Sequence, residues 1–186
     1  MDADEVLLEM EDSMEKAVNY LTHEFASVRT GKASPALVEN MDVEAYGSQM
    51  KLKQLALITT PEPRLLVIQP FDQTTVKAIE KALKESRLGI NPSVDGKIIR
   101  LPMPELSEER RKELVKAIKG MGEETRVRIR GFRRDALDTA KKQKKDSKLT
   151  EDQLKDFEAD AQKLTDKFSK SIDDHIAHKE AEIMRV

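Results

Sequence analysis

The sequence predicts an α+β protein in which a long three-helix bundle carries an inserted small β/α module. Three long segments, residues 2–29, 107–145 and 150–184, repeat apolar side chains at a spacing of three and four, which is typical of helices with one buried side. Between the first two, residues 31–105 lose this period and alternate short β-rich runs with glycine and proline turns. Because no helix is apolar all round, the three helices must bury their apolar sides against one another.

The first helix is expected over residues 2–29. Gly31 is predicted to occupy the C′ position that closes this helix. Arg29 then lies in the last turn, where a positive charge is favourable. The apolar side of the helix is formed by Leu7, Met10, Met14, Ala17, Leu21, Phe25 and Val28.

The insert is expected to hold four strands and one helix. The strands are predicted at residues 42–46, 55–59, 65–69 and 97–101, and the helix at residues 73–87. The predicted turns are Gly47-Ser48 after the first strand, Pro61-Glu62-Pro63 between the second and the third, and Asp95-Gly96 as a hairpin turn before the fourth.

The second and third long helices have clear start signals. Ser107 is a predicted N-cap, followed by acidic residues in the first turn. Thr150 and Gln153 form a Thr-x-x-Gln capping box before the last helix. The apolar side of the second helix holds Leu114, Ile118, Met121, Thr125, Ile129, Phe132 and Ala136, and that of the third holds Leu154, Phe157, Ala161, Leu164, Phe168, Ile172, Ile176 and Ile183.

This pattern predicts two domains. Residues 1–30 and 106–186 would form a discontinuous bundle domain, and residues 31–105 would form the inserted domain. The chain crosses between them twice, from Gly31 to Pro35 and from Pro102 to Pro104. Two crossings rich in residues that cannot continue a helix permit a hinge.

Composition narrows the class of protein. Of 186 residues, 37% are charged and 4% are aromatic, and the chain has no cysteine, which excludes disulfides and thiolate chemistry and suits a reducing cytoplasm. No apolar run is long enough to span a membrane, and no signal-peptide pattern opens the sequence. A cytoplasmic location is therefore expected.

Charge is unevenly distributed along the chain. The net charge is −2 overall, but it is +7 over residues 107–145, against −6 over residues 1–30 and −4 over residues 146–186. The acidic helices could simply pair with the basic one. The alternative is a face of the basic helix that binds a polyanion.

A basic stripe on the second helix favours the second alternative, a face that binds a polyanion. Lys112, Lys119, Arg126 and Arg133 are spaced by seven, and Arg130 lies one turn from the last two. The planar guanidinium group suits phosphate better than an ammonium group does. Few aromatic residues flank the stripe, so phosphate contact and shape recognition of structured RNA are expected rather than base stacking. A face of internal salt bridges remains the alternative.

Motifs for catalysis are absent from the sequence. No glycine-rich phosphate loop, Gly-x-Ser-x-Gly or His-Glu-x-x-His occurs. His175 and His178 lie one turn apart, with Glu182 one turn further on, but solvated histidine pairs on helices are common and no metal site is predicted. We therefore expect a binding protein with no catalytic residues, metal or cofactor, and not an enzyme.

Six stretches resemble the ribosome recycling factor family, in the right order and over nearly the whole chain. They are residues 28–35 (VRTGKASP), 89–92 (GINP), 106–112 (LSEERRK), 130–136 (RGFRRDA), 163–166 (KLTD) and 179–182 (KEAE). The resemblance implies an L-shaped, two-domain protein with the outline of a transfer RNA. It also implies that, with elongation factor G and GTP, the protein splits the post-termination ribosome and frees its subunits and messenger RNA for further translation.

The resemblance also implies which residues bind. The bundle would lie along large-subunit ribosomal RNA near the peptidyl-transferase region, and Arg29, Arg110, Arg130 and Arg133 match the RNA-contacting positions of the family. The ribosome and elongation factor G are the expected partners of a monomer that has no small-molecule substrate and does not bind a membrane.

Two other classes stay open on the residues alone. One is a helical adaptor or chaperone that binds protein through its bundle, and weak salt dependence of binding would favour it. The other is a hydrolase with an unrecognised carboxylate pair, which nucleotide turnover by the purified chain would reveal.

Overall fold

The computed structural model describes residues 1–185, and contacts divide the chain into two compact units. One unit holds residues 1–25 and 115–181, and the other holds residues 26–114 and the chain from Glu182 onward. The elements are long helices and short antiparallel strands, which confirms the predicted α+β class. The domain limits predicted near residues 30 and 106 stay a prediction, because an end of each of the three long helices passes from one unit into the other.

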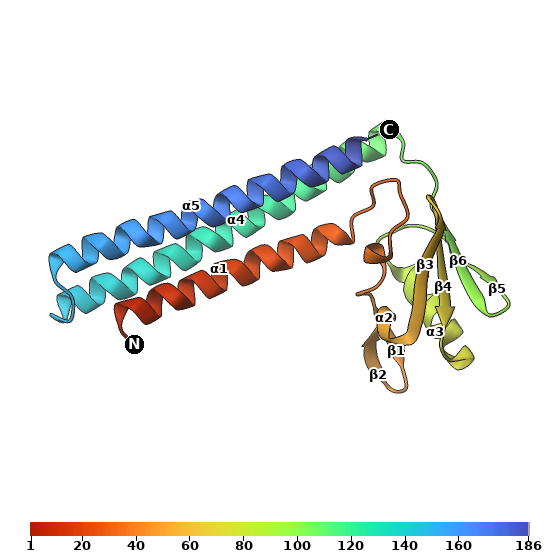
Figure 1. Ribbon diagram of the computed structural model, residues 1–186, viewed down its shortest axis with the longest axis horizontal. Helices are drawn as coiled ribbons and strands as arrows, with labels where there is room; N and C mark the ends of the chain where they lie inside the picture. The colour runs from red at the N-terminus through yellow and green to blue at the C-terminus, as the bar shows by residue number, and fades with distance from the viewer. Residues whose placement is uncertain (186) are drawn as a thin grey trace. The chain divides into compact units, whose positions relative to one another are not determined.

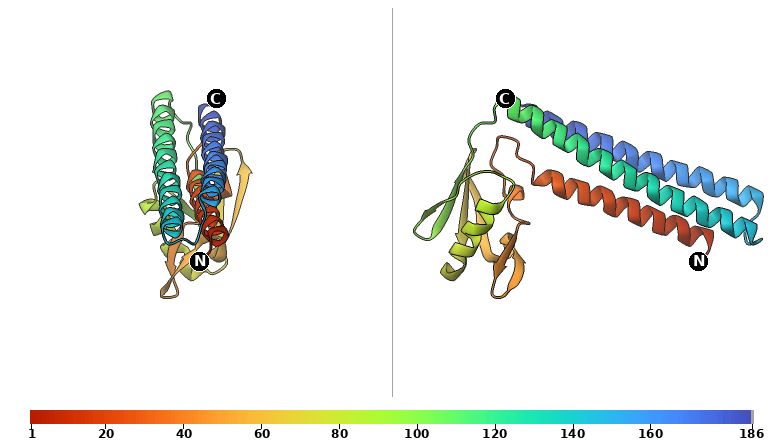
Figure 2. Two further views of the ribbon diagram at one scale, coloured as in Figure 1. Left: turned by 90° about the vertical axis from the view of Figure 1, so that its left-hand side faces the viewer. Right: turned by 180° about the vertical axis from the view of Figure 1, so that it is seen from behind.

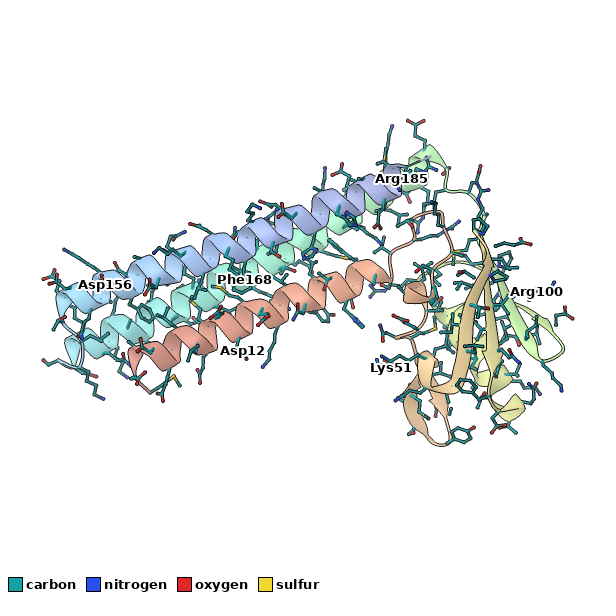
Figure 3. All side chains as sticks on the ribbon, viewed as in Figure 1. Asp12, Lys51, Arg100, Asp156, Phe168 and Arg185 are labelled. Carbon is teal, nitrogen blue, oxygen red and sulfur yellow. The ribbon has the colours of Figure 1, made fainter. Side chains whose placement is uncertain are left out.

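The first unit is built by three helices that run side by side, α1 (Ala3–Ala26), α4 (Glu108–Lys145) and α5 (Glu151–Met184). Figures 1 and 2 show that α4 runs antiparallel to the other two. Most of the predicted apolar residues supply its buried core, among them Phe168, which Figure 3 labels. Val6 and Val18 are also buried but were not predicted, and six predicted residues are only half-buried: Leu7, Leu114, Met121, Phe132, Leu154 and Leu164. Fully or almost fully buried are Met14 and Leu21 of α1, Ile118 and Ile129 of α4, and Ala161 and Ile172 of α5.

Hydrogen bonds at the helix starts confirm the predicted caps. The backbone N–H of Arg110 donates to Ser107 Oγ at 3.1 Å. At the start of α5, the N–H of Thr150 donates to Gln153 Oε1 at 2.9 Å, and the N–H of Gln153 donates to Thr150 Oγ1 at 3.1 Å. Together these bonds satisfy N–H groups that the first turns of the helices leave unpaired.

The predicted end of the first helix is wrong. Helix α1 stops at Ala26, so Gly31 is not its C′ residue and Arg29 is not in its last turn. Beyond the helix, Val28 is buried and the Arg29 guanidinium donates to the carbonyl of Pro104. We attribute the early end to these contacts, which a helix continued to residue 29 would place differently. Gly31 still has a positive φ of 87°, which suits a residue without a side chain.

The second unit contains a four-stranded and a two-stranded antiparallel sheet (Figure 1). The larger sheet has the order β3-β4-β6-β5, and the smaller one is the hairpin β1-β2. The elements are the 3₁₀ turn η1 (Pro35–Leu37), β1 (Asp42–Ala45), β2 (Ser48–Lys51), α2 (Leu52–Leu55), β3 (Ala56–Glu62), β4 (Leu65–Pro70), η2 (Gln73–Thr75), α3 (Val76–Glu85), β5 (Ser93–Asp95) and β6 (Ile98–Pro102). Their shared core includes Leu52, Leu66, Ile68, Ile79, Leu83, Ile99 and Leu101.

The predicted strands are present, with two corrections. Residue 55 ends the helical turn α2, so the second predicted strand starts at Ala56. That strand continues through Pro61, where a turn was predicted, because β3 is an edge strand and a missing N–H costs little there. Its pairing with β4 shifts register between Thr59 and Glu62.

Candidate nucleic-acid interface

The predicted basic stripe lies on one continuous helix. Helix α4 has 38 residues, and at ~1.5 Å per residue it is about 57 Å long. The side chain of Arg130 is 61% exposed, whereas that of Arg126 is 29% exposed. Lys112 and Lys119 are also exposed. Most of the stripe is therefore open to a ligand. Arg126 has the least exposed side chain of the stripe residues that form ion pairs.

One carboxylate, Glu123, holds two of the predicted arginines. Arg130 Nη2 lies 3.0 Å from Glu123 Oε1, and Arg126 Nη1 lies 3.3 Å from Glu123 Oε2. The hydrogen bonds from Arg130 and then Arg126 lower the pKa of Glu123 below its ordinary value. The carboxylate is thus ionised at neutral pH and orients both guanidinium groups on the helix surface.

Ion pairs to α5 involve Arg126 again and one further cation, Lys119. Arg126 also donates to Asp173, and this bond raises the pKa of Arg126. Lys119 Nζ lies 3.5 Å from Glu180 Oε1. These pairs agree in part with the alternative interpretation, in which an acidic helix pairs with the basic helix. They remain partly exposed, and exposed ion pairs contribute little to stability, so phosphate oxygens can replace the carboxylates at small cost.

The N-terminal part of the stripe is paired within its own helix. Arg110 Nη1 lies 2.8 Å from Glu113 Oε2, and Lys112 Nζ lies 3.5 Å from Glu108 Oε1. Both cations are more than half exposed. Such pairs between residues three or four apart orient the side chains weakly and leave them accessible.

Arg133 differs from Arg130 in its surroundings. Its side chain is half-buried, and its Nε is buried without a hydrogen-bond partner among residues 1–185. Burial of a polar atom has a cost unless a partner satisfies it. Arg133 therefore contributes to packing as well as to surface charge, and substitutions at Arg130 report on binding more cleanly.

Arg29 has a structural contact that the sequence did not suggest. It is half-buried and donates from Nη2 to the carbonyl of Pro104, 75 residues away in the sequence. Burial and the positive charge of Arg110 lower the pKa of Arg29. Arg29 and Arg110 thus lie close together, and Arg29 contacts the predicted hinge segment at Pro104.

The predicted hinge residues lie in segments that backbone hydrogen bonds hold to neighbouring strands and turns. Pro35 is the first residue of η1, and Pro102 is the last residue of β6. The N–H of Ala33 donates to Pro63 O at 2.8 Å, and the N–H of Met103 donates to Arg64 O at 2.7 Å. Both predicted hinge segments are therefore bonded to the turn between β3 and β4. Both lie within the unit of residues 26–114, so their role as crossings between domains stays a prediction.

Sequence reasoning left two features of α4 unassigned. The helix ends in exposed lysines that have no ion pair within the described part of the chain: Lys141, Lys142, Lys144 and Lys145. The only indication of these lysines in the sequence was the net positive charge of residues 107–145. The second feature is Arg128, which is exposed and whose guanidinium lies 6.0 Å from the centroid of the Tyr20 ring.

The described residues give no support for other kinds of site. Among residues 1–185, no group of three or more His, Asp or Glu side chains could hold a metal ion. None of the described helices is long and apolar enough to cross a membrane.

Comparisons with known proteins agree over the full chain. The family described as "Ribosome recycling factor" matches residues 21–184. The chain is 57% identical to the ribosome-recycling factor of Akkermansia muciniphila over the whole of both proteins, and 51% identical to that of Alkaliphilus metalliredigens over 98% of each.

Solved structures give the same result. The solution structure of a ribosome recycling factor matches with a TM-score of 0.81 at 44% identity, covering 100% of this chain and 99% of the other. A second match, with a TM-score of 0.68 at 45% identity and full coverage of both chains, is to models of the T. thermophilus ribosome recycling factor and the E. coli elongation factor G bound to the E. coli post-termination complex. With relatives this similar along its whole length, the chain belongs to the ribosome recycling factor family.

Proposed function

We propose that this protein, with elongation factor G and GTP, disassembles the post-termination ribosomal complex and releases the subunits and messenger RNA. The observation that carries the proposal is full-length similarity to ribosome recycling factors, one of them placed with elongation factor G on a post-termination complex. The protein acts as a translation factor and not as an enzyme. Its place of action is the cytoplasm, where its ribosomes are.

The exposed cations of α4 provide the ribosomal RNA contact. Arg130 is the central residue, because it is well exposed and Glu123 already orients it. A phosphate that replaces this carboxylate receives a preformed guanidinium donor. The other proposed contacts are Arg29, Arg110, Lys112, Lys119, Arg126 and Arg133.

Movement at the two chain crossings is the second part of the proposal. A bundle of long helices can transmit a push along its length, while Gly31, Pro35, Pro102 and Pro104 supply segments that a few backbone rotations can reorient. Elongation factor G would drive or capture that movement. The bonds of Ala33 and Met103 to the β3–β4 turn must then break and re-form.

Sucrose-gradient analysis of post-termination ribosomes tests the function. We expect the protein, elongation factor G and GTP together to convert intact ribosomes into subunits, and each omission to leave them intact. Arg130→Ala should reduce splitting, and Arg87→Ala, which changes an exposed arginine after α3, should not. Intact ribosomes in the complete mixture would contradict the proposal.

A further inference from the structure

The turn between β5 and β6 holds the single Asp-Gly pair of the sequence, Asp95-Gly96, and the sequence has no Asn-Gly pair. Asp95 ends β5 and pairs with Ile98 of β6, so Gly96 and Lys97 form the hairpin turn. Gly96 has a positive φ of 61° at the first central position, where a type II′ turn prefers glycine. A side-chain carboxyl group thus directly precedes an amide nitrogen that no Cβ shields.

The carboxyl group of Asp95 and the amide of Gly96 are both accessible. The Asp95 side chain is 66% exposed. A Cβ atom placed on Gly96 would meet no atom within 4 Å. The N–H of Gly96 lies outside the β5–β6 ladder, and none of the turn hydrogen bonds in the described part of the chain uses it. Neither group must therefore leave a buried position before the two can meet.

Strand β5 can open without unfolding the rest of its sheet. It is the outer strand beside β6, it has three residues, and all three are exposed (Figure 1). Short exposed segments of this kind open locally at a low cost in free energy. Such opening frees the backbone of Asp95 to rotate, which brings its carboxyl carbon to the next amide nitrogen.

One ion pair opposes a reaction between these groups. Arg100 of β6, labelled in Figure 3, places its Nη2 at 3.5 Å from Asp95 Oδ2. It favours the carboxylate, which accepts a nucleophile less readily than the protonated carboxyl group does. Both side chains are more than half exposed, and exposed ion pairs are weak. The pair therefore slows the reaction without preventing it.

The two Asp-Ser pairs of the sequence lack this combination of features. Asp146-Ser147, after α4, is also exposed, but the N–H of Ser147 donates to Lys144 O at 3.0 Å. In Asp12-Ser13 the second amide belongs to the hydrogen-bonded ladder of α1. Both serine nitrogens also lie beside a Cβ. Asp95 is therefore better placed than either pair to react with its own backbone.

We propose that Asp95 is the site at which this protein forms isoaspartate, and that the β5–β6 turn then becomes a substrate for a protein isoaspartyl methyltransferase. The Gly96 nitrogen bonds to Cγ of the protonated Asp95 carboxyl group, and the N–H proton and the carboxyl hydroxyl leave as water. The product is a cyclic succinimide. Water then adds to one of its two carbonyl groups and breaks the bond from that carbonyl to nitrogen. Opening at Cγ restores aspartate, and opening at the main-chain carbonyl gives isoaspartate.

Isoaspartate changes the hairpin and creates the methylation site. The main chain then runs through Cβ and Cγ of residue 95 and is one atom longer, so the turn no longer holds residue 95 opposite Ile98. The former main-chain carbonyl becomes a free carboxylate. A methyltransferase esterifies this carboxylate with the methyl group of S-adenosylmethionine. The ester returns to the succinimide as the Gly96 nitrogen attacks it and methanol leaves.

Ageing the full-length protein for several weeks in heavy-oxygen water, at neutral pH and physiological temperature, tests the proposal. Each succinimide that hydrolyses adds one heavy oxygen atom to the residue that formed it, whichever product results. Mass spectrometry with electron-transfer fragmentation locates this atom and distinguishes isoaspartate from aspartate. We expect both signals at Asp95 to exceed those at Asp146 by at least about tenfold, because the Ser147 amide is hydrogen-bonded.

An isoaspartyl methyltransferase with labelled S-adenosylmethionine provides the second readout, and it should label aged protein but not fresh protein. Asp95→Glu keeps the charge but needs a larger ring, so methyl labelling of the aged variant should fall at least about tenfold. Asp95→Asn loses ammonia in place of water to give the same succinimide. It should react faster and yield the same ratio of isoaspartate to aspartate. Asp146→Glu is the matched control and should keep wild-type labelling.

Any of three results overturns the proposal. The first is no more heavy oxygen at Asp95 than at Asp146, and the second is wild-type methyl labelling of aged Asp95→Glu. The third is a product ratio in Asp95→Asn that differs from that of the wild type. These assays need no ribosome, so they stand or fall separately from the proposed function.

Discussion

Glu123 bears on both interpretations of the basic stripe, as a face of internal salt bridges and as a phosphate-binding face. It pairs with both Arg126 and Arg130, as a face of salt bridges would require, and in the proposed function it also orients them for a phosphate. Because all three side chains are on the surface, the pairs contribute little to stability. Their arrangement therefore matters more for binding than for folding.

The carboxyl titration of Glu123 tests this arrangement. Its pKa should lie below the ordinary 4.5 in the wild type and rise towards it in Arg130→Ala, because the Arg130 bond is the largest cause of the shift. Since the folded-state pKa is lowered, the pairing is present at neutral pH and is lost as the pH falls through that pKa. Carboxyl-detected NMR measures both values. An unchanged pKa in the variant would show that Arg130 does not hold Glu123 in solution.

At the scale of single residues, the sequence proposes which cations bind RNA, and this stays a prediction; it does not reveal what those cations contact within the protein. The spacing of Arg126 and Arg130 on a helix follows from sequence alone. The pairing of Arg126 with Asp173 and of Arg29 with Pro104 does not, because each joins segments far apart in the chain. The half-burial of Arg133 likewise depends on packing that its position on a helical wheel does not reveal.

At the scale of elements, Gly122 sets how closely α4 and α5 pack. A Cβ atom at this position would lie 2.3 Å from Ile176 Cδ1 and 3.0 Å from its Cγ1. Neither distance is tolerable without a shift of Ile176. The absence of a side chain at Gly122 therefore permits this contact, at the usual cost of a glycine in a helix.

Alanine substitutions on α4 test the close contact. Gly120→Ala meets no atom within 4 Å and should stabilise the protein by up to about 1 kcal/mol through helix propensity. Gly122→Ala gains the same propensity but must displace Ile176, which costs about 1–3 kcal/mol in a well-packed core. Urea denaturation should thus find Gly122→Ala the less stable variant by about 1–3 kcal/mol. Equal stability of Gly120→Ala and Gly122→Ala would show that α4 and α5 can move apart at Gly122 at no cost in free energy.

The long helices and the strands β1, β3, β4 and β6 were predictable from the sequence, whereas β2, β5 and the short helical turn α2 were not. Helices of 24 to 38 residues repeat their apolar side many times, and their caps use recognisable residues. Strand β2 and strand β5 have four and three residues, with mostly exposed side chains, so no alternation identifies them. The Asp95-Gly96 turn did signal the β5–β6 hairpin. In the β1–β2 hairpin the turn lies at Tyr46 and Gly47, one residue earlier than predicted, and both have positive φ.

At the scale of the whole molecule, the proposed movement depends on bonds that must open. The N–H groups of Ala33 and Met103 hold the two crossings to the β3–β4 turn. If these crossings flex, both amides open far more often than those of the central strand β4. We expect native-state hydrogen exchange at Ala33 and Met103 to be at least about tenfold faster than at Ile68, which lies in the sheet core. Exchange as slow as that of Ile68 would place the hinge elsewhere.

The proposed function depends on the exposed cations of α4 as an RNA-binding surface, and substitution of Arg130 tests this proposal. Arg130→Ala should change the free energy of unfolding by no more than about 0.5 kcal/mol, since the side chain is exposed. Its affinity for the large ribosomal subunit should fall by about 1–3 kcal/mol if a charge-assisted contact is lost. Arg87→Ala serves as the matched control.

The most direct measurement is the salt dependence of binding to isolated large ribosomal subunits. With about four phosphate contacts, wild-type affinity should fall by about two orders of magnitude between about 50 and about 200 mM salt, and the logarithmic slope of Arg130→Ala should be shallower by about one. Arg87→Ala should keep the wild-type slope. A wild-type affinity that hardly changes with salt, or an Arg130→Ala slope equal to that of the wild type, would contradict phosphate binding by α4.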